Sequence, residues 1–172
     1  MKLRIGLDCD DTCNYWYKCY LERFGTPKTD DIITKHVQRD LIKDRNFWLN
    51  LPVKNIPDFE VTLYCTKRVN PKSWTKKWLE DHHYPKAPVY QVVCQRKNKA
   101  SVIKGKVDVF IDDSVHNFIE MNLSGVPCLL MDSENNQHWG PIGRIYSLSK
   151  EEIEETYLLF MDSVFPNFKN LL

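Results

Sequence analysis

Short apolar runs alternate along the chain with longer stretches that carry apolar residues at helical spacing. Each run has the length of a buried strand. The runs are residues 3–7, 61–65, 89–94, 107–111 and 126–131. Alternation of strands with helices is typical of a parallel sheet covered by helices. We therefore expect an α/β fold with a parallel sheet of about five strands.

The predicted helices have recognisable ends. Pro71 stands in the first turn of one helix, where its missing N–H has no intrahelical partner to lose. Ser114 can cap a second helix, which stops at Gly125. The run Ser149-Lys150-Glu151-Glu152 matches a capping box at the start of a C-terminal helix, and we expect Pro166 to end that helix.

One interval interrupts the alternation. Residues 8–60, between the first two runs, are far more than a strand-to-strand crossover requires. Helical patterns cover residues 15–24, which Gly25 closes, and residues 30–43. We expect residues 13–58 to form a small helical cap inserted after the first strand. Residues 1–12 and 59–172 would then form the core domain, a Rossmann-like parallel sheet with helices on both faces.

The composition is that of an ordinary globular protein, with 42% hydrophobic and 27% charged residues. The formal net charge of +1 provides no strong overall field to attract nucleic acid or an anionic membrane. No run approaches the roughly 20 consecutive apolar residues of a membrane span. The N-terminal residues also lack the pattern of a secretory signal. We expect a cytoplasmic protein with no membrane partner.

The six cysteines of the sequence are expected to be reduced thiols. Cys65, Cys94 and Cys128 occupy or end apolar runs, where a free cysteine behaves as a small buried hydrophobe. There is no Cys-x-x-Cys pair, and His82 and His83 lack a partner at metal-ligand spacing. We therefore expect neither a disulfide nor a zinc site.

Three of the predicted strands end in polar residues, and these carry the candidate chemistry. Asp8 and Asp10 follow the first strand, Thr66 ends the second, and Asp112 and Asp113 end the fourth. The carboxyl ends of parallel strands meet at one edge of a sheet, where ligands bind. Converging carboxylates repel one another, and Mg²⁺ is a hard cation that binds carboxylate oxygens. The pattern predicts a magnesium site at this edge.

The same residues resemble the haloacid dehalogenase-like phosphatases. The first motif of that family, Asp-x-Asp-x-Thr after an apolar strand, is similar to residues 8–12, Asp-Cys-Asp-Asp-Thr. The second, a strand ending in Thr or Ser, looks like Leu63-Tyr64-Cys65-Thr66, and the fourth looks like residues 109–114, Val-Phe-Ile-Asp-Asp-Ser. The resemblance spans roughly residues 3 to 132. Asp11 departs from the family pattern, which often has Gly at that position.

The third motif of the family is a lysine on the helix before the fourth strand. Lys97, Lys99 and Lys104 compete for this role. The helix runs away from the catalytic edge, so its N-terminal residues lie nearest the phosphate. We therefore predict that Lys99 binds the phosphate.

The resemblance implies a role for each motif residue. Asp8 would attack phosphorus and form an aspartyl-phosphate intermediate. Asp10 would protonate the leaving alcohol and then activate water. Thr66 and Lys99 would bind the phosphoryl oxygens.

The resemblance also implies a metal site. Mg²⁺ would contact Asp8, the backbone carbonyl of Asp10, and a carboxylate of the Asp112-Asp113 pair. Asp113 is the first choice for that ligand, and Asp112 would orient Lys99.

The substrate is predicted from the cap. Residues 45–52, Arg-Asn-Phe-Trp-Leu-Asn-Leu-Pro, are similar to the segment of 5′(3′)-deoxyribonucleotidases that surrounds the base with aromatic rings. Phe47 and Trp48 would stack on a nucleobase or pack the cap on the core. Lys67 and Arg68 would reach a second phosphate or the sugar end, or stay solvated.

Three hypotheses follow. The first is a nucleotidase that acts on (deoxy)nucleoside monophosphates. The second is a phosphatase of a polynucleotide 3′ end or of another small phosphomonoester. The third is a non-catalytic scaffold that retains the fold. The cap interval holds eight Lys or Arg against six Asp or Glu, a balance that does not separate the first two.

Overall fold

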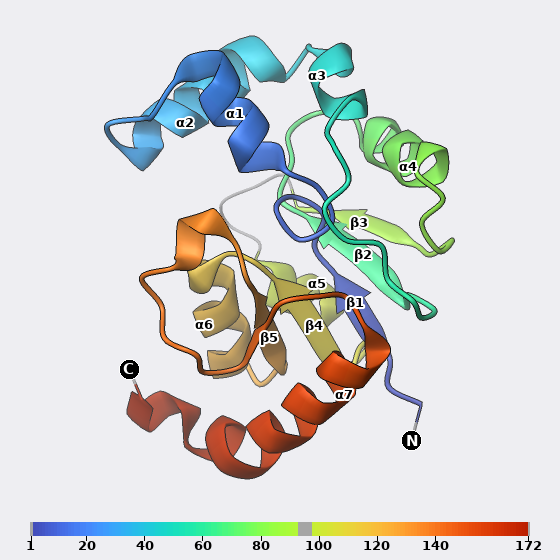
Figure 1. Ribbon diagram of the computed structural model, residues 1–172, viewed down its shortest axis with the longest axis vertical. Helices are drawn as coiled ribbons and strands as arrows, with labels where there is room; N and C mark the ends of the chain where they lie inside the picture. The colour runs from blue at the N-terminus through green and yellow to red at the C-terminus, as the bar shows by residue number, and fades with distance from the viewer. Residues whose placement is uncertain (1, 93–97, 172) are drawn as a thin grey trace.

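The sheet is entirely parallel and has six strands in the order β3-β2-β1-β4-β5-β6. The computed structural model describes residues 2–92 and 98–171 (Figure 1). The strands are β1 (Ile5–Leu7), β2 (Leu63–Thr66), β3 (Val89–Gln91), β4 (Val109–Asp112), β5 (Cys128–Met131) and β6 (Arg144–Ile145). This arrangement confirms the predicted Rossmann-like α/β fold. Cys94, at the end of the third apolar run, lies outside the described residues.

The sixth strand was not predicted. It contains only Arg144 and Ile145, which pair in parallel with Leu130 and Met131 of β5. Two residues are too few to show the alternation by which a strand is recognised in a sequence. Residues 144 and 145 therefore form an edge strand because they pair with β5, and their own sequence does not predict a strand.

Seven α-helices connect or cover the strands among the described residues, with short π and 3₁₀ segments between or after them. The α-helices are α1 (Trp16–Phe24), α2 (Asp30–His36), α3 (Arg45–Leu49), α4 (Lys72–Asp81), α5 (Lys99–Ile103), α6 (Val115–Leu123) and α7 (Lys150–Leu159). The π-helical segment η1 (Val37–Leu41) continues α2 and precedes α3. The 3₁₀ segment η2 (Glu134–Asn136) precedes β6, and η3 (Phe160–Val164) and η4 (Phe165–Leu171) follow α7. None of the described helices is both long and apolar enough to span a bilayer.

The predicted helix ends are largely observed. The Ser114 hydroxyl accepts a hydrogen bond from the backbone N–H of Asn117 at 3.3 Å. Ser149 accepts one from the N–H of Glu152, but the Glu152 carboxylate binds the backbone N–H groups of residues 146 and 147. The predicted capping box is thus only half formed. The prediction that Pro166 ends the C-terminal helix is also wrong, because α7 stops at Leu159 and Pro166 lies inside η4.

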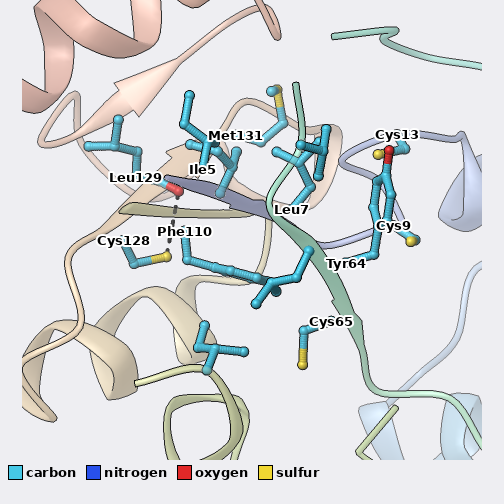
Figure 2. Close-up of a cluster of buried hydrophobic side chains, with 14 of the residues drawn as sticks. Ile5, Leu7, Cys9, Cys13, Tyr64, Cys65, Phe110, Cys128, Leu129 and Met131 are labelled. Carbon is cyan, nitrogen blue, oxygen red and sulfur yellow. Dashed lines mark hydrogen bonds between the residues drawn. The ribbon is translucent and has the colours of Figure 1, made fainter. Parts of the chain in front are cut away.

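The core surrounds the central strands (Figure 2). Leu7, Phe110 and Leu129, from three neighbouring strands, are fully buried. At Gly6 the packing is so close that an added Cβ would lie 2.8 Å from a Phe110 ring carbon. The five described cysteines are free thiols; Cys65 and Cys128 are buried as predicted, and Cys9 and Cys13 are buried as well.

The insertion between β1 and β2 lies beyond the carboxyl ends of the strands. Its helices α1 and α2 stand over this edge of the sheet, whereas α3 lies beside α4 of the core (Figure 1). At the base of the insertion, Asn14 and Val53 form an antiparallel bridge. The indole N–H of Trp78 on α4 donates to the Leu51 carbonyl at 2.8 Å. The helical part of the insertion, the predicted cap, thus covers the strand ends that carry the predicted site.

Candidate active site

Asp8 and Lys99 form the centre of the site. Asp8 directly follows β1, and its backbone N–H continues the sheet by donating to the Ile111 carbonyl at 2.9 Å. Lys99 is the first residue of α5, and its ammonium Nζ lies 2.6 Å from Asp8 Oδ1 and 2.6 Å from Asp112 Oδ2. Both ion pairs are buried. Lys99 therefore ties the candidate nucleophile to the end of β4.

The structure separates Lys99 from its competitors. Lys104 is exposed, and its ammonium donates to the Ser124 carbonyl at the surface. Lys97 lies outside the described residues. Burial acts to lower the pKa of Lys99, but the charges of Asp112 and Asp8 outweigh it and raise that pKa well above its usual value. Lys99 therefore stays charged between the two carboxylates.

Asp112 is held firmly behind Lys99. Its Oδ1 accepts hydrogen bonds from the Ser114 backbone N–H and from the Asn117 side chain, each at 3.0 Å. It is fully buried. The geometry agrees with the predicted role of Asp112 as the residue that orients Lys99.

Asp8, Asp112 and Asp113 form a compact acidic cluster. One carboxylate oxygen from each lies within 4.8 Å of the others. Burial raises the pKa of Asp8 to about 7, although the charge of Lys99 acts against this rise. Burial also raises the pKa of Asp113 well above its usual value, together with the charges of Asp11 and Asp112. The all-oxygen donor set fits a hard divalent cation, which would offset this repulsion.

Asp10 faces the same cavity as Asp8, but an arginine holds its carboxylate. The Nε of Arg68 donates to Asp10 Oδ2 at 2.8 Å, and Nη2 of Arg68 donates to Asp10 Oδ1. Arg68 lines the cavity, yet its guanidinium is engaged with Asp10 and is buried. Arg68 therefore has a protein partner in Asp10, and its predicted contact with a substrate phosphate or sugar stays a prediction.

The departure from the family pattern at Asp11 has a structural explanation. Asp11 adopts φ 54°, a left-handed conformation in which glycine is favoured and Asp is tolerated. Its carboxylate accepts a hydrogen bond from the Tyr17 backbone N–H at 2.9 Å, at the first turn of α1. The Asp11 carbonyl also accepts from the Lys54 ammonium at 2.7 Å. Asp11 thus fixes the cap to the loop that carries Asp8.

A cavity of about 640 Å³ lies between the strand ends at Asp8 and the cap. Asp8, Asp10, Asp113 and Lys99 line its floor. Its volume lies within the range of small-molecule sites. The structure therefore brings these four predicted site residues to one place.

The cap supplies the aromatic wall of the cavity. Trp16 and Tyr17 of α1 line it, as does Trp48 of α3. The Trp48 ring lies 4.8 Å from the Arg68 guanidinium carbon and covers it. Phe47 lies outside the lining and packs edge-on against Trp48, with 5.4 Å between ring centroids. Of the two predicted stacking residues, only Trp48 contacts the cavity.

Thr66 ends β2 as predicted and is fully buried. It is not among the residues that line the cavity. Its hydroxyl has no hydrogen-bond partner within the described part of the chain. A buried hydroxyl without a partner is uncommon, and the Thr66 hydroxyl can still donate a hydrogen bond.

Sequence reasoning missed several residues of the site. Asn117, which binds Asp112, lies three residues after the helix cap Ser114, and this spacing was the available signal. Trp16 and Tyr17 follow the first motif directly, at the start of the first cap helix. The loop after β5 brings His138 to the cavity, whereas Trp139 packs against Phe118.

Comparison with known proteins adds no family to this description. A scan against protein-family models found no match to the chain, and a search of curated proteins found none. Any functional assignment therefore rests on the geometry around Asp8 and Lys99.

Proposed function

We propose that this chain is a Mg²⁺-dependent phosphomonoester hydrolase in which Asp8 is the nucleophile. The observation that carries the proposal is the position of Lys99, whose ammonium lies 2.6 Å from both Asp8 and Asp112. A purely structural ion pair needs one acid for one base. Here a third carboxylate, the half-buried Asp113, completes a group of three acids around one base. Such a group is suited to a cation and to phosphoryl transfer.

The metal would be held by Asp8 and Asp113, with the backbone carbonyl of Asp10 as a further oxygen donor. Oxygen ligands on short side chains match the preference of Mg²⁺. When bound, Mg²⁺ neutralises charge on the carboxylates and on the phosphoryl oxygens. Lys99 is paired with both Asp8 and Asp112, so it would orient Asp8 and stabilise the negative charge that develops in the transition state.

The reaction would take place in two steps. A carboxylate oxygen of Asp8 forms a bond to phosphorus while the bond to the leaving oxygen breaks. Asp10, which also lines the cavity, would transfer a proton to the leaving oxygen. In the second step water attacks the phosphorus, its proton passes to Asp10, and the Asp8 carboxylate is restored. The buried Thr66 hydroxyl is a candidate donor to a phosphoryl oxygen.

The aromatic wall supports a nucleoside monophosphate as the substrate. Trp16, Tyr17 and Trp48 of the cap line the same cavity as the carboxylates that would receive the phosphate. Stacking of a base on an aromatic ring contributes about 1–3 kcal/mol. A planar base under the cap and a phosphate at Asp8 would occupy both ends of the cavity.

A substrate panel tests the proposal. Purified protein with Mg²⁺ is expected to hydrolyse p-nitrophenyl phosphate, and the activity should disappear with EDTA and in Asp8→Asn. Asp81→Asn is the matched control, because Asp81 is an exposed acid on α4 paired with Lys77. Thymidine and deoxyuridine monophosphates should be preferred over 3′-phosphorylated oligonucleotides. A preference for the oligonucleotides would indicate a polynucleotide-end phosphatase, and no hydrolysis of any compound would favour the scaffold hypothesis.

A further inference from the structure

Arg68 is a buried arginine whose contacts all lie within the protein. Its side chain is 1% exposed, although it lines the cavity. Two of its nitrogens bond the two oxygens of Asp10, and Nη1 donates to the Thr75 hydroxyl at 2.9 Å. The Trp48 ring covers the guanidinium from the cap. The side chain is therefore fixed in one orientation by α4, by the cap and by Asp10.

The two oxygens of Asp10 are not equivalent. Oδ1 accepts from Arg68 and also from the Asn14 amide at 3.3 Å. Oδ2 accepts only from Arg68 Nε, at 2.8 Å, among the residues that the structure describes. A carboxylate oxygen has about two acceptor positions. The free position on Asp10 is thus on Oδ2.

We propose that Arg68 is a positioning residue that holds Asp10 for the second half of the reaction, with Oδ2 as the proton acceptor. This inference rests on the proposed phosphohydrolase function. In this half-reaction the water oxygen bonds to phosphorus, and the bond from phosphorus to the Asp8 oxygen breaks. Its electron pair returns to the Asp8 carboxylate, and the water proton passes to Oδ2 of Asp10.

The chemistry of the pair favours this step over the first. The two-point contact with Arg68 fixes the orientation of the Asp10 carboxylate, and with it the direction in which Oδ2 presents its remaining acceptor position to an attacking water. Formation of the phosphoenzyme from a substrate with a good leaving group requires little proton donation. Loss of Arg68 should therefore slow the breakdown of the phosphoenzyme more than its formation.

Rapid-quench kinetics with p-nitrophenyl phosphate and Mg²⁺ test the proposal, with aspartyl-phosphate on Asp8 measured directly. In Arg68→Met we expect a burst of nitrophenol at about the wild-type rate and phosphoenzyme decay slowed about 10- to 100-fold, a part of the 10²–10⁴ typical of general acid–base catalysis. Arg68→Lys keeps the charge but loses the two-point contact, so its decay should be slowed less. Arg4→Met is the control: Arg4 precedes β1 and forms an ion pair with Asp108, and the phosphoenzyme of this variant should decay at the wild-type rate.

Separate outcomes distinguish the two proposals. If the wild-type protein forms no phosphoenzyme and hydrolyses nothing, the proposed function itself fails. If the wild type turns over but Arg68→Met slows formation and decay equally, or slows neither, only the role of Arg68 is overturned.

A double variant serves as the control for misfolding of Arg68→Met. Asp10→Asn/Arg68→Met removes both partners, so no charge of the pair is left buried alone. If Arg68 acts through Asp10, the double variant should decay no more slowly than Asp10→Asn. An additional slowing in the double variant would contradict the proposal, even if Arg68→Met itself does not fold.

Discussion

The ammonium of Lys99 lies 2.6 Å from a carboxylate oxygen of Asp8, and the same nitrogen lies 2.6 Å from Asp112. One cation thus connects the loop after β1 with the end of β4, across the centre of the sheet. All three side chains are almost completely buried. Stability and the proposed reaction are therefore coupled, because the proposed nucleophile Asp8 belongs to a buried group of two acids and one base.

Replacing Lys99 should damage both stability and activity. Lys99→Met leaves buried carboxylates without their cation, and loss of one partner of a buried pair costs about 3–5 kcal/mol. Hydrolysis should fall by about 100-fold or more. Urea unfolding and steady-state kinetics measure the two effects. Lys104→Met is the control and should change stability by about 0.5 kcal/mol at most, since Lys104 is exposed. Equal effects of the two substitutions would contradict the assignment of Lys99.

Metal binding should depend on pH in a defined direction. The folded protein retains a proton on Asp8 up to about pH 7, whereas an unfolded aspartate, with its ordinary pKa of 3.8, releases it earlier. Folded protein therefore binds more protons than unfolded protein between about pH 4 and 7, and stability without metal should fall as pH rises through this window.

Mg²⁺ requires the ionised carboxylates, so its stabilising effect should grow with pH. Thermal unfolding in EDTA and in Mg²⁺, at pH 5.5 and pH 8, measures this. We expect a larger Mg²⁺-induced increase in Tm at pH 8, and no increase in Asp113→Asn. An equal increase at both pH values would show that the cation does not bind this cluster.

The centre of the sheet should not tolerate a larger residue at position 6. A Cβ at Gly6 would lie 2.8 Å from Phe110 and 2.9 Å from Val107 side-chain atoms. Gly6→Ala should lower the free energy of unfolding by about 1–3 kcal/mol through overpacking. Gly140→Ala serves as the control, because nothing lies within 4 Å of an added Cβ there. The midpoint of urea unfolding reports both, and a neutral Gly6→Ala would contradict the tight packing.

Substrate stacking should depend on α1 more than on Phe47. Trp16→Leu keeps an apolar side chain but removes the flat face that lines the cavity. If a base stacks there, KM for thymidine monophosphate should rise by about tenfold, which corresponds to about 1.4 kcal/mol. KM for glycerol phosphate should change little. Phe47→Leu should leave both KM values near wild type; a larger effect of Phe47→Leu would restore the stacking role predicted from the sequence.

The convergence of Asp8, Asp10, Asp112 and Asp113 could be predicted from the sequence. Each residue follows an apolar strand, and parallel strands place their carboxyl ends at one edge whatever their order. The choice of Lys99 followed from the direction of its helix. The caps at Ser114 and Ser149 were also recognisable, because capping depends on neighbouring residues. Local patterns were therefore enough for the fold class and for the residues at the centre of the site.

Only the tertiary structure decided which partners these residues have. Arg68 bonds Asp10 because the loop after β2 meets the loop after β1, a contact between distant parts of the chain. Phe47 turned out to lie outside the cavity while Trp16 lines it, because the packing of α1 and α3 sets which rings face inward. The pairing of β6 with β5 depended equally on a distant strand. Strands and caps are encoded by near neighbours, whereas long side chains take their partners from elements brought together by folding.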